Sequence, residues 1–184
     1  DARKTLMIAG ADTQLDTDRD RQRLFTETLP DMQKLLTDHT GRQQAMFIAG
    51  DLTWDVYGRN ADVKQFVRQL GIPCYPVIGN HDYDKYVTPT DTTNYAAPYE
   101  ADFGPTYYAF MLGDACYVVL NDIKYTGYKR YTNSLVQGHQ MQWLRTLLGV
   151  VLQQNTNVFV VMHAPLMFPG SGRLTEGGDE LKAM

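Results

Sequence analysis

The chain has 184 residues, and its 17 Lys and Arg against 21 Asp and Glu give a formal net charge of −4. Hydrophobic residues make up 43% and charged residues 21%, which is ordinary globular usage and excludes a disordered chain. No apolar run approaches the roughly 18 residues that span a bilayer, and the mild acidity argues against a basic nucleic-acid-binding patch. The length predicts one domain, residues 1–184.

The first half of the chain alternates short apolar runs with helical patterns. The expected elements are, in order, a strand at 5–9, a helix at 18–39, a strand at 45–49, a helix at 60–70 and a strand at 75–78. Pro30 is expected to split or kink the first helix, because proline lacks the N–H that the helix interior needs. Asn60 is the expected N-cap of the second helix, and Gly71 is expected to end it.

The second half is expected to begin with a long loop at 83–104, rich in Tyr, Asp and Thr. The elements after it are strands at 107–111 and 116–120 joined through Gly113-Asp114, a helix at about 138–153 and a strand at 158–162. The tail from 170 to 184 is rich in glycine and then begins a helical pattern. This order predicts an α/β protein with a mostly parallel central sheet.

Polar side chains follow the predicted strands where each strand ends. They are Asp12 and Gln14, then Asp51, then Asn80 and His81, and finally His163. Because the carboxyl ends of parallel strands share one edge of a sheet, these groups are expected to converge there. Carboxylate, amide and imidazole donors together suit Zn, Fe, Mn or Mg.

Each of these residues also has an ordinary structural explanation when it is taken alone. A Gly-Asp pair after a strand is usually a turn, and Asn80 could be a left-handed turn residue. His163 could be a core histidine that is satisfied by hydrogen bonds. It is the joint occurrence at successive strand ends that favours a metal site.

The motifs at these strand ends carry a family resemblance. The chain resembles the calcineurin-like metallophosphoesterases, whose series runs D-x-H, G-D-x-x, G-N-H-[D/E], a single H and G-H-x-H. Gly50-Asp51-Leu52-Thr53, Gly79-Asn80-His81-Asp82 and His163 match this series in order, and the segment 103–108 looks like one common in bacterial members with an added C-terminal domain. The resemblance covers roughly residues 5–170. It implies that family's α/β fold, a β-sheet sandwich flanked by helices.

The chain departs from the family's pattern in two places. In Asp12-Thr13-Gln14, Gln14 stands where the family usually has His, although some branches carry D-x-Q. No G-H-x-H follows His163, and Gly138-His139 lacks the second histidine. We therefore expect a domain that is incomplete at its C-terminus, with the last strands of the fold missing, weak metal binding and poor catalysis, although its parent is a hydrolase.

The resemblance also implies a ligand set and a reaction. It implies hydrolysis of phosphomonoesters or phosphodiesters by two divalent or trivalent metal ions of unknown identity (Fe, Zn, Mn or Mg) and a water nucleophile. Asp51 would bridge the metals, with Asp12 and Gln14 on one metal and Asn80 and His163 on the other.

The residues after the metal ligands have implied roles too. His81 would stand beside the leaving-group oxygen as the proton donor, and Asp82 would orient His81. Asn80, Tyr83 and Lys85 are the expected substrate contacts. The substrate is expected to be a phosphorylated small molecule, glycan or lipid.

The loops that follow the two central motifs are expected to rim the cleft. They carry Trp54, Asp55, Tyr57, Tyr83, Lys85 and Tyr86. Lys85 could meet a phosphate, and the tyrosines could stack on a sugar or a base. The alternative is that these tyrosine-rich loops pack on themselves.

Two other kinds of function remain open at this point. A binding module that kept the fold and lost catalysis is favoured by Gln14 and by the absent last motif, and disfavoured by the intact Asp51, Asn80, His81 and His163. An interaction domain using the 83–104 loop is disfavoured by the same residues. The resemblance further implies a periplasmic or secreted protein, with possible additional domains in the parent chain.

Overall fold

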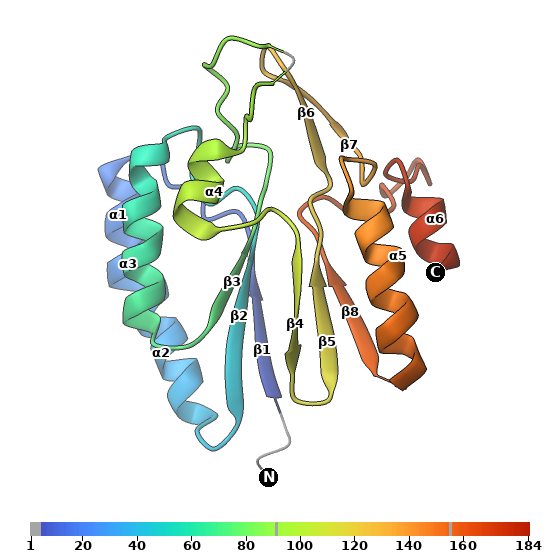
Figure 1. Cartoon of the computed structure of the whole chain (residues 1–184). Coiled ribbons are helices and arrows are strands. Elements are labelled where there is room, and N and C mark those ends of the chain that lie inside the picture. The colour runs from blue at the N-terminus through green and yellow to red at the C-terminus, as the bar shows by residue number, and fades with distance from the viewer. Residues whose placement is uncertain (1–4, 91, 155) are drawn as a thin grey trace.

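Two three-stranded sheets face each other in the computed structural model, which describes residues 5–90, 92–154 and 156–184 (Figure 1). The first consists of β1 (Thr5–Gly10), β2 (Gln43–Ala49) and β3 (Cys74–Val77), and the second of β4 (Tyr108–Leu112), β5 (Ala115–Val119) and β8 (Asn157–Val161). All strands of the first sheet are parallel. In the second, β4 is antiparallel to β5, and β5 is parallel to β8. The predicted α/β sandwich is confirmed, whereas the single, mostly parallel central sheet is wrong.

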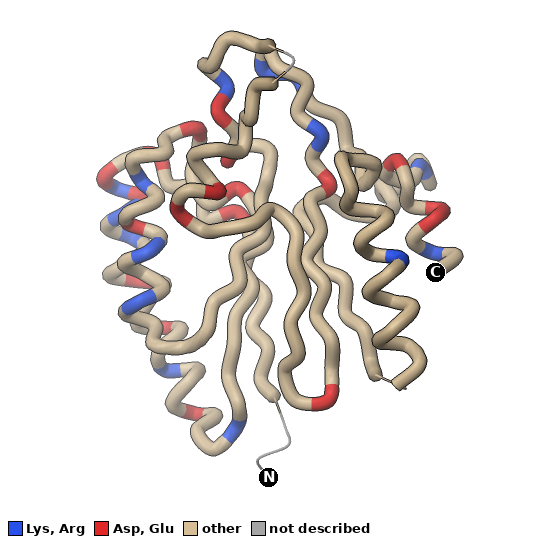
Figure 2. The backbone as a smooth tube through the Cα atoms, in the orientation of Figure 1, with Lys and Arg blue, Asp and Glu red and all other residues tan. Residues whose placement is uncertain are grey.

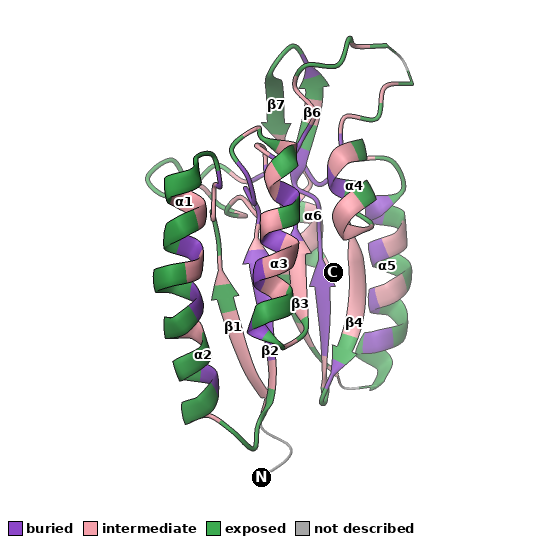
Figure 3. Cartoon of the chain, turned by 90° about the vertical axis from the view of Figure 1, so that its left-hand side faces the viewer, coloured by how far each residue is buried: buried purple, intermediate pink, exposed green. Residues whose placement is uncertain are grey.

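Helices cover the outer face of each sheet. The first sheet packs against α1 (Asp18–Arg23), the π-helical turn η1 (Leu24–Thr28), α2 (Leu29–Asp38), α3 (Asn60–Leu70) and α4 (Ala97–Phe103). The second sheet packs against α5 (Gln140–Val151), with α6 (Gly178–Ala183) beside it. Two short 3-10 turns, η2 (Tyr57–Arg59) and η3 (Leu152–Gln154), precede α3 and follow α5. The buried residues of the helices lie on the sides that face the sheets (Figure 3).

The strands of the two sheets are uncharged. The six strands of the two sheets contain no charged residue, and the charged residues lie on the helices, the loops and the hairpin at 123–133 (Figure 2). This pattern suits strands that are covered on both faces. No helix in the described part of the chain is long and apolar enough to cross a membrane.

Aromatic rings fill the space between the two sheets. The ring of Phe47 on β2 lies 5.8 Å from Tyr75, 5.9 Å from Phe110 and 5.7 Å from Tyr117, measured between ring centroids. Tyr75 stacks directly on Phe110 at 3.6 Å. Such rings bury large apolar areas, so this layer sets the distance between the two sheets.

Local chemistry explains where the helices differ from expectation. The predicted interruption of the first helix is present: the π-helical turn η1 separates α1 from α2 and ends two residues before Pro30. Proline cannot make the regular α-helical bond to residue 26, which lies in η1. Asn60 is not a capping residue, since its side-chain amide donates to Asp102 at 2.8 Å. Gly71 ends α3 with φ of 74°, as predicted.

Two elements at the top of the molecule went unpredicted. The expected loop at 83–104 contains α4, and β6 (Ile123–Gly127) pairs with β7 (Arg130–Asn133) as a hairpin. The turn residues of this hairpin, Tyr128 and Lys129, have φ of 51° and 59°, a conformation usually signalled by Asn or Gly. The hairpin rises beside the loop before α4, above the carboxyl ends of the strands (Figure 1).

The aromatic layer generates a stability prediction. Phe47→Ala is expected to lower the free energy of unfolding by about 3–5 kcal/mol, because a buried ring is replaced by a cavity between the sheets. Urea unfolding followed by circular dichroism measures this loss. Tyr128→Ala is the matched control, since that ring is 76% exposed and its removal is expected to cost under about 0.5 kcal/mol. Equal losses in the two variants would contradict the proposed role of the layer.

Candidate metal centre

The loops that follow β1 and β2 run side by side and continue the parallel pairing of the strands. The amide of Asp12 donates to Gly50 O at 3.1 Å, and the amide of Gln14 donates to Asp51 O at 2.9 Å. Asp12, Gln14 and Asp51 all have left-handed backbone, with φ of 52°, 44° and 49°. Non-glycine residues rarely adopt this conformation, and its cost is typical of functional sites. The strained turns bring the side chains of both loops to one place.

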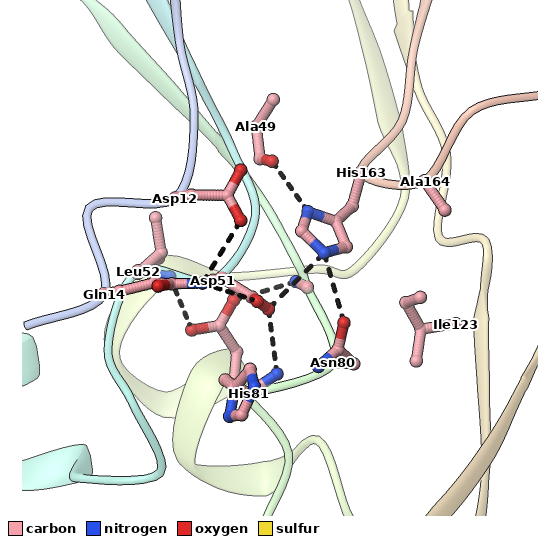
Figure 4. Close-up of polar contacts among 12 residues, drawn as sticks. Asp12, Gln14, Ala49, Asp51, Leu52, Asn80, His81, Ile123, His163 and Ala164 are labelled. Atoms are coloured by element: carbon pink, nitrogen blue, oxygen red, sulfur yellow. Dashed lines mark hydrogen bonds and ion pairs between the residues drawn. The ribbon is translucent and has the colours of Figure 1, made fainter. Parts of the chain in front are cut away.

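The structure brings the five predicted metal ligands together (Figure 4). One ligand atom from each of Asp12, Asp51 and His163 lies within 4.8 Å of the other two. Asn80 Oδ1 is 3.3 Å from His163 Nε2. Gln14 Nε2 is 3.3 Å from Asp12 Oδ1 and 3.4 Å from Asp51 Oδ2. The Gln14 amide can turn by 180° about its last bond, which exchanges Nε2 for Oε1 and presents an oxygen donor instead.

The orientation of the His163 ring follows from its hydrogen bonds. His163 Nδ1 lies 2.9 Å from Ala49 O, and a carbonyl oxygen only accepts, so we assign the proton to Nδ1. His163 Nε2 then faces Asn80 Oδ1 and, at 3.5 Å, Asp51 Oδ1. Without a further proton, three acceptor atoms converge here with no hydrogen between them. A metal cation fits this donor set, because carboxylate, amide and neutral imidazole are its usual ligands.

Two glycines leave the room that the side chains of His163 and Asp51 need to reach the cluster. A Cβ on Gly50 would overlap the ring of His163, and Gly50 has φ of 84°. A Cβ on Gly79 would overlap the backbone nitrogen and the carboxylate of Asp51. The glycine of each motif is therefore required by the side chain that packs against it. The glycine in each motif thus has a steric cause.

Asp82 does not have its predicted role. Its carboxylate is 4% exposed and accepts hydrogen bonds from the backbone amides of Leu52 at 2.9 Å, Thr53 at 3.3 Å and Gly79 at 2.8 Å. Burial raises the pKa of Asp82 to about 7. Among the described residues these amides are its hydrogen-bond partners, so the expectation that Asp82 orients His81 is wrong. Asp82 instead ties the loop after β2 to the loop after β3.

Three other residues surround His81. Asp55 Oδ1 and Lys85 Nζ both lie 3.0 Å from His81 Nδ1, and Lys85 forms an ion pair with Asp55. The indole of Trp54 stacks on the imidazole, with centroids 3.8 Å apart and 20° between the planes. The backbone amide of His81 donates to Asp51 Oδ1 at 2.9 Å. Asp55, not Asp82, is therefore the carboxylate beside this ring.

The three predicted substrate contacts differ in how the structure places them. Tyr83 is 4% exposed, and its hydroxyl donates to Ile123 O at 2.7 Å, so a direct contact between Tyr83 and substrate is contradicted. Tyr83 instead packs inward, against the segment that enters β6. The side chain of Lys85 is 8% exposed and is paired with Asp55. Substrate contact by Lys85 stays a prediction, as does the contact proposed for Asn80.

Sequence reasoning missed Asp122. It is fully buried, and its carboxylate accepts from the backbone amides of His163 at 3.3 Å and Ala164 at 2.8 Å. Burial raises the pKa of Asp122 to about 6. The sequence did contain a signal for Asp122, because this residue follows the apolar run of β5 just as the other site residues follow their strands. His139 and His39 are helix-end residues of α5 and α2, outside the cluster.

Comparisons with known proteins add a family and a fold. The calcineurin-like phosphoesterase family matches residues 11–183. A dimetal phosphatase from Danio rerio is 12% identical, with a TM-score of 0.59 over 96% of this chain and 76% of that one. A phosphopantetheinyl hydrolase from Mycobacterium tuberculosis is 12% identical, with a TM-score of 0.46 over 98% and 75%. At this identity the Danio rerio structure shows a shared fold alone. The search of curated proteins found no significant match.

The close approach of His163 to Gly50 generates a prediction about metal affinity. Gly50→Ala is expected to weaken Zn²⁺ binding by about 10–100-fold, because the new methyl group displaces the imidazole. Isothermal titration calorimetry measures this change. Gly41→Ala is the matched control: Gly41 also has positive φ, of 88°, but a Cβ there meets nothing within 4 Å. Both variants should lose about 1–2 kcal/mol of stability to backbone strain. Unchanged Zn²⁺ affinity in Gly50→Ala would contradict the proposed packing.

The two buried carboxyls predict how stability changes with pH. The pKa values of Asp82 and Asp122, about 7 and about 6, are raised by burial above the ordinary value of 3.8. At pH values between 3.8 and the raised pKa values, the two carboxyls are protonated in the folded chain and ionised in the unfolded chain. The free energy of unfolding therefore falls as pH rises. Urea unfolding of metal-free protein at pH 5 and pH 8 should show lower stability at pH 8. Asp82→Asn should flatten this dependence, and a rise in stability towards pH 8 would contradict it.

Proposed function

This chain belongs to the calcineurin-like phosphoesterase family, and from that premise we propose that it hydrolyses phosphate esters with the help of metal ions held at the strand ends. The observation that carries the proposal is the convergence of His163 Nε2, Asn80 Oδ1 and Asp51 Oδ1 at the strand ends, with a carboxylate oxygen of Asp12 within 4.8 Å of ligand atoms of His163 and Asp51. Divalent cations in such sites polarise the phosphoryl group and make water nucleophilic near neutral pH.

The position of Asp51 supports a shared role between two cations. Its Oδ1 lies 3.5 Å from Nε2 of His163, which follows β8 and in turn contacts Asn80 after β3, whereas its Oδ2 lies 3.4 Å from Gln14 Nε2. Asp12 lies on the Gln14 side, since its Oδ1 is 3.3 Å from Gln14 Nε2. The carboxylate thus spans two half-sites, each with a carboxylate or imidazole and an amide. We propose one metal ion for each half-site.

The chain's own residues support a proton-donating role for His81. Its Nδ1 is engaged by Asp55 and Lys85, and its ring face is covered by Trp54. Nε2 is the ring nitrogen left for substrate. The backbone bond from His81 to Asp51 keeps the ring next to the metal ligands. We propose that His81 protonates or hydrogen-bonds the leaving-group oxygen of a phosphate monoester or diester.

A non-catalytic binding module is the second candidate, and Gln14 is the observation that favours it. A neutral amide in place of imidazole weakens the hold on borderline metals such as Zn²⁺. Such a module would bind metal and phosphate without turnover. Metal binding and hydrolysis therefore have to be measured together.

Removal of one ligand should separate these functions. In the presence of Mn²⁺ the chain is expected to hydrolyse p-nitrophenyl phosphate or bis-p-nitrophenyl phosphate slowly, because no G-H-x-H follows His163, and chelation by EDTA should stop the reaction. His163→Ala should lower the rate by ~100-fold or more, because a metal ligand is lost. His139→Ala is the matched control and should leave the rate unchanged, since His139 lies outside the cluster.

Three outcomes would count against the proposal in different ways. Metal binding without hydrolysis of either ester would favour the binding module. Hydrolysis that survives EDTA would exclude a metal-dependent reaction. Equal rates for His163→Ala and His139→Ala would remove His163 from the site.

A further inference from the structure

Trp54 is a large side chain held in place by its backbone and not by burial in the core. Its backbone amide donates to Leu15 O at 3.1 Å, and the next residue, Asp55, has left-handed backbone with φ of 59°. The Trp54 side chain is nevertheless 44% exposed. The left-handed turn at Asp55 thus holds the indole beside the candidate metal centre with almost half of it open to solvent.

The position of this indole is defined by His81. The two rings stack with centroids 3.8 Å apart, so one indole face is covered by imidazole. An indole is larger than the imidazole that it covers, and almost half of Trp54 stays exposed. An apolar, planar surface is therefore available at the edge of the His81 ring. This edge is where the proposed function places the leaving group.

The polar groups beside the two rings are already paired. Lys85 is bound to Asp55, and both lie against His81 Nδ1. The carboxylate and the ammonium neutralise each other, so this side of the site offers a leaving group little net charge. What remains for recognition is the flat apolar face of Trp54.

Resting on the proposed function, we propose that Trp54 is a specificity-determining residue that packs against the leaving group. The preferred substrates are phosphate esters whose leaving group carries an aromatic or heteroaromatic ring. Stacking of a ring on an aromatic side chain contributes about 1–3 kcal/mol for nucleobases, which corresponds to about 5–150-fold in affinity. The phosphoryl group itself is bound by the metal centre and does not depend on Trp54.

Non-hydrolysable phosphonates test this inference without requiring turnover. Benzylphosphonate and methylphosphonate share the phosphoryl group, and only the first carries a ring. In calorimetry on the Zn²⁺-loaded chain, Trp54→Ala should weaken benzylphosphonate about 10-fold and change methylphosphonate by less than about 2-fold. Trp54→Phe should keep most of the preference, because it retains an aromatic face.

Tyr131→Ala is the matched control for the loss of a surface ring. Tyr131 lies on β7 and is 42% exposed, close to the exposure of Trp54, and its removal should alter neither phosphonate. Equal weakening of both phosphonates in Trp54→Ala, or no weakening, would overturn the inference and leave the proposed function standing. Failure of the unaltered Zn²⁺-loaded chain to bind either phosphonate would overturn the proposed function itself.

Fluorescence offers a direct readout of contact. The chain has two tryptophans, so Trp143→Phe makes Trp54 the sole indole. Trp143 packs against Tyr107 with centroids 5.1 Å apart, a contact that phenylalanine can replace. In this Zn²⁺-loaded variant, 4-nitrobenzylphosphonate should quench the emission and methylphosphonate should not. Binding of 4-nitrobenzylphosphonate without quenching would overturn the inference.

Discussion

The carboxylate of Asp82 holds together two of the four loops on which the candidate metal centre is built. It accepts backbone hydrogen bonds from Leu52, Thr53 and Gly79, and so joins the chain after β2 to the chain after β3. Burying a carboxyl group is costly, and hydrogen bonds from several amides offset that cost. Asp122 has the corresponding role in the second sheet, where it accepts from the segment that carries His163. Each sheet thus secures its own loop with one buried carboxyl.

The site also depends on the distance between the two sheets. His163 follows β8 of the second sheet, yet its Nδ1 bonds to Ala49 O at the end of β2 in the first. This bond is possible only because Gly50 leaves room for the ring and because the aromatic layer around Phe47 sets the spacing. The geometry of the ligands therefore depends on the packing of the sandwich. A change at Gly50 or in the aromatic layer would move the imidazole of His163 relative to Asp51.

The parts predicted from sequence were those with a local signal. Apolar runs that end in Gly-Asp, Gly-Asn-His or His mark the ends of β2, β3 and β8, and the sheet edge then brings Asp51, Asn80 and His163 together. Pairing between strands has no such signal, so the order of the elements alone predicted a single central sheet, and the sandwich of two sheets was predicted only through the family resemblance. The turn of the β6–β7 hairpin could not be recognised from the sequence, because Tyr128 and Lys129 adopt the left-handed backbone that Asn or Gly usually signals.

The partners of individual side chains were harder to predict than the cluster itself. Tyr83 and Asp82 stand in the same short segment as Asn80 and His81, and their residue types suit either chemistry or support. The structure shows that both are buried and bonded inward. The choice depends on which groups the neighbouring loops present, and this arises only when segments distant in sequence meet. Asp55 lies beside His81 for the same reason.

Metal binding and folding are linked through this arrangement. In the neutral form of His163, the lone pair of Nε2 faces Asn80 Oδ1 and Asp51 Oδ1, an arrangement that is electrostatically unfavourable without a cation. A ligand that binds only the folded chain stabilises it in proportion to the logarithm of its concentration over its Kd. The unfolded chain cannot bring Asp12, Asp51 and His163 within 4.8 Å of one another, so a cation bound by these residues would favour the folded state. Such a cation would stabilise the fold at this edge as well as supply the proposed chemistry.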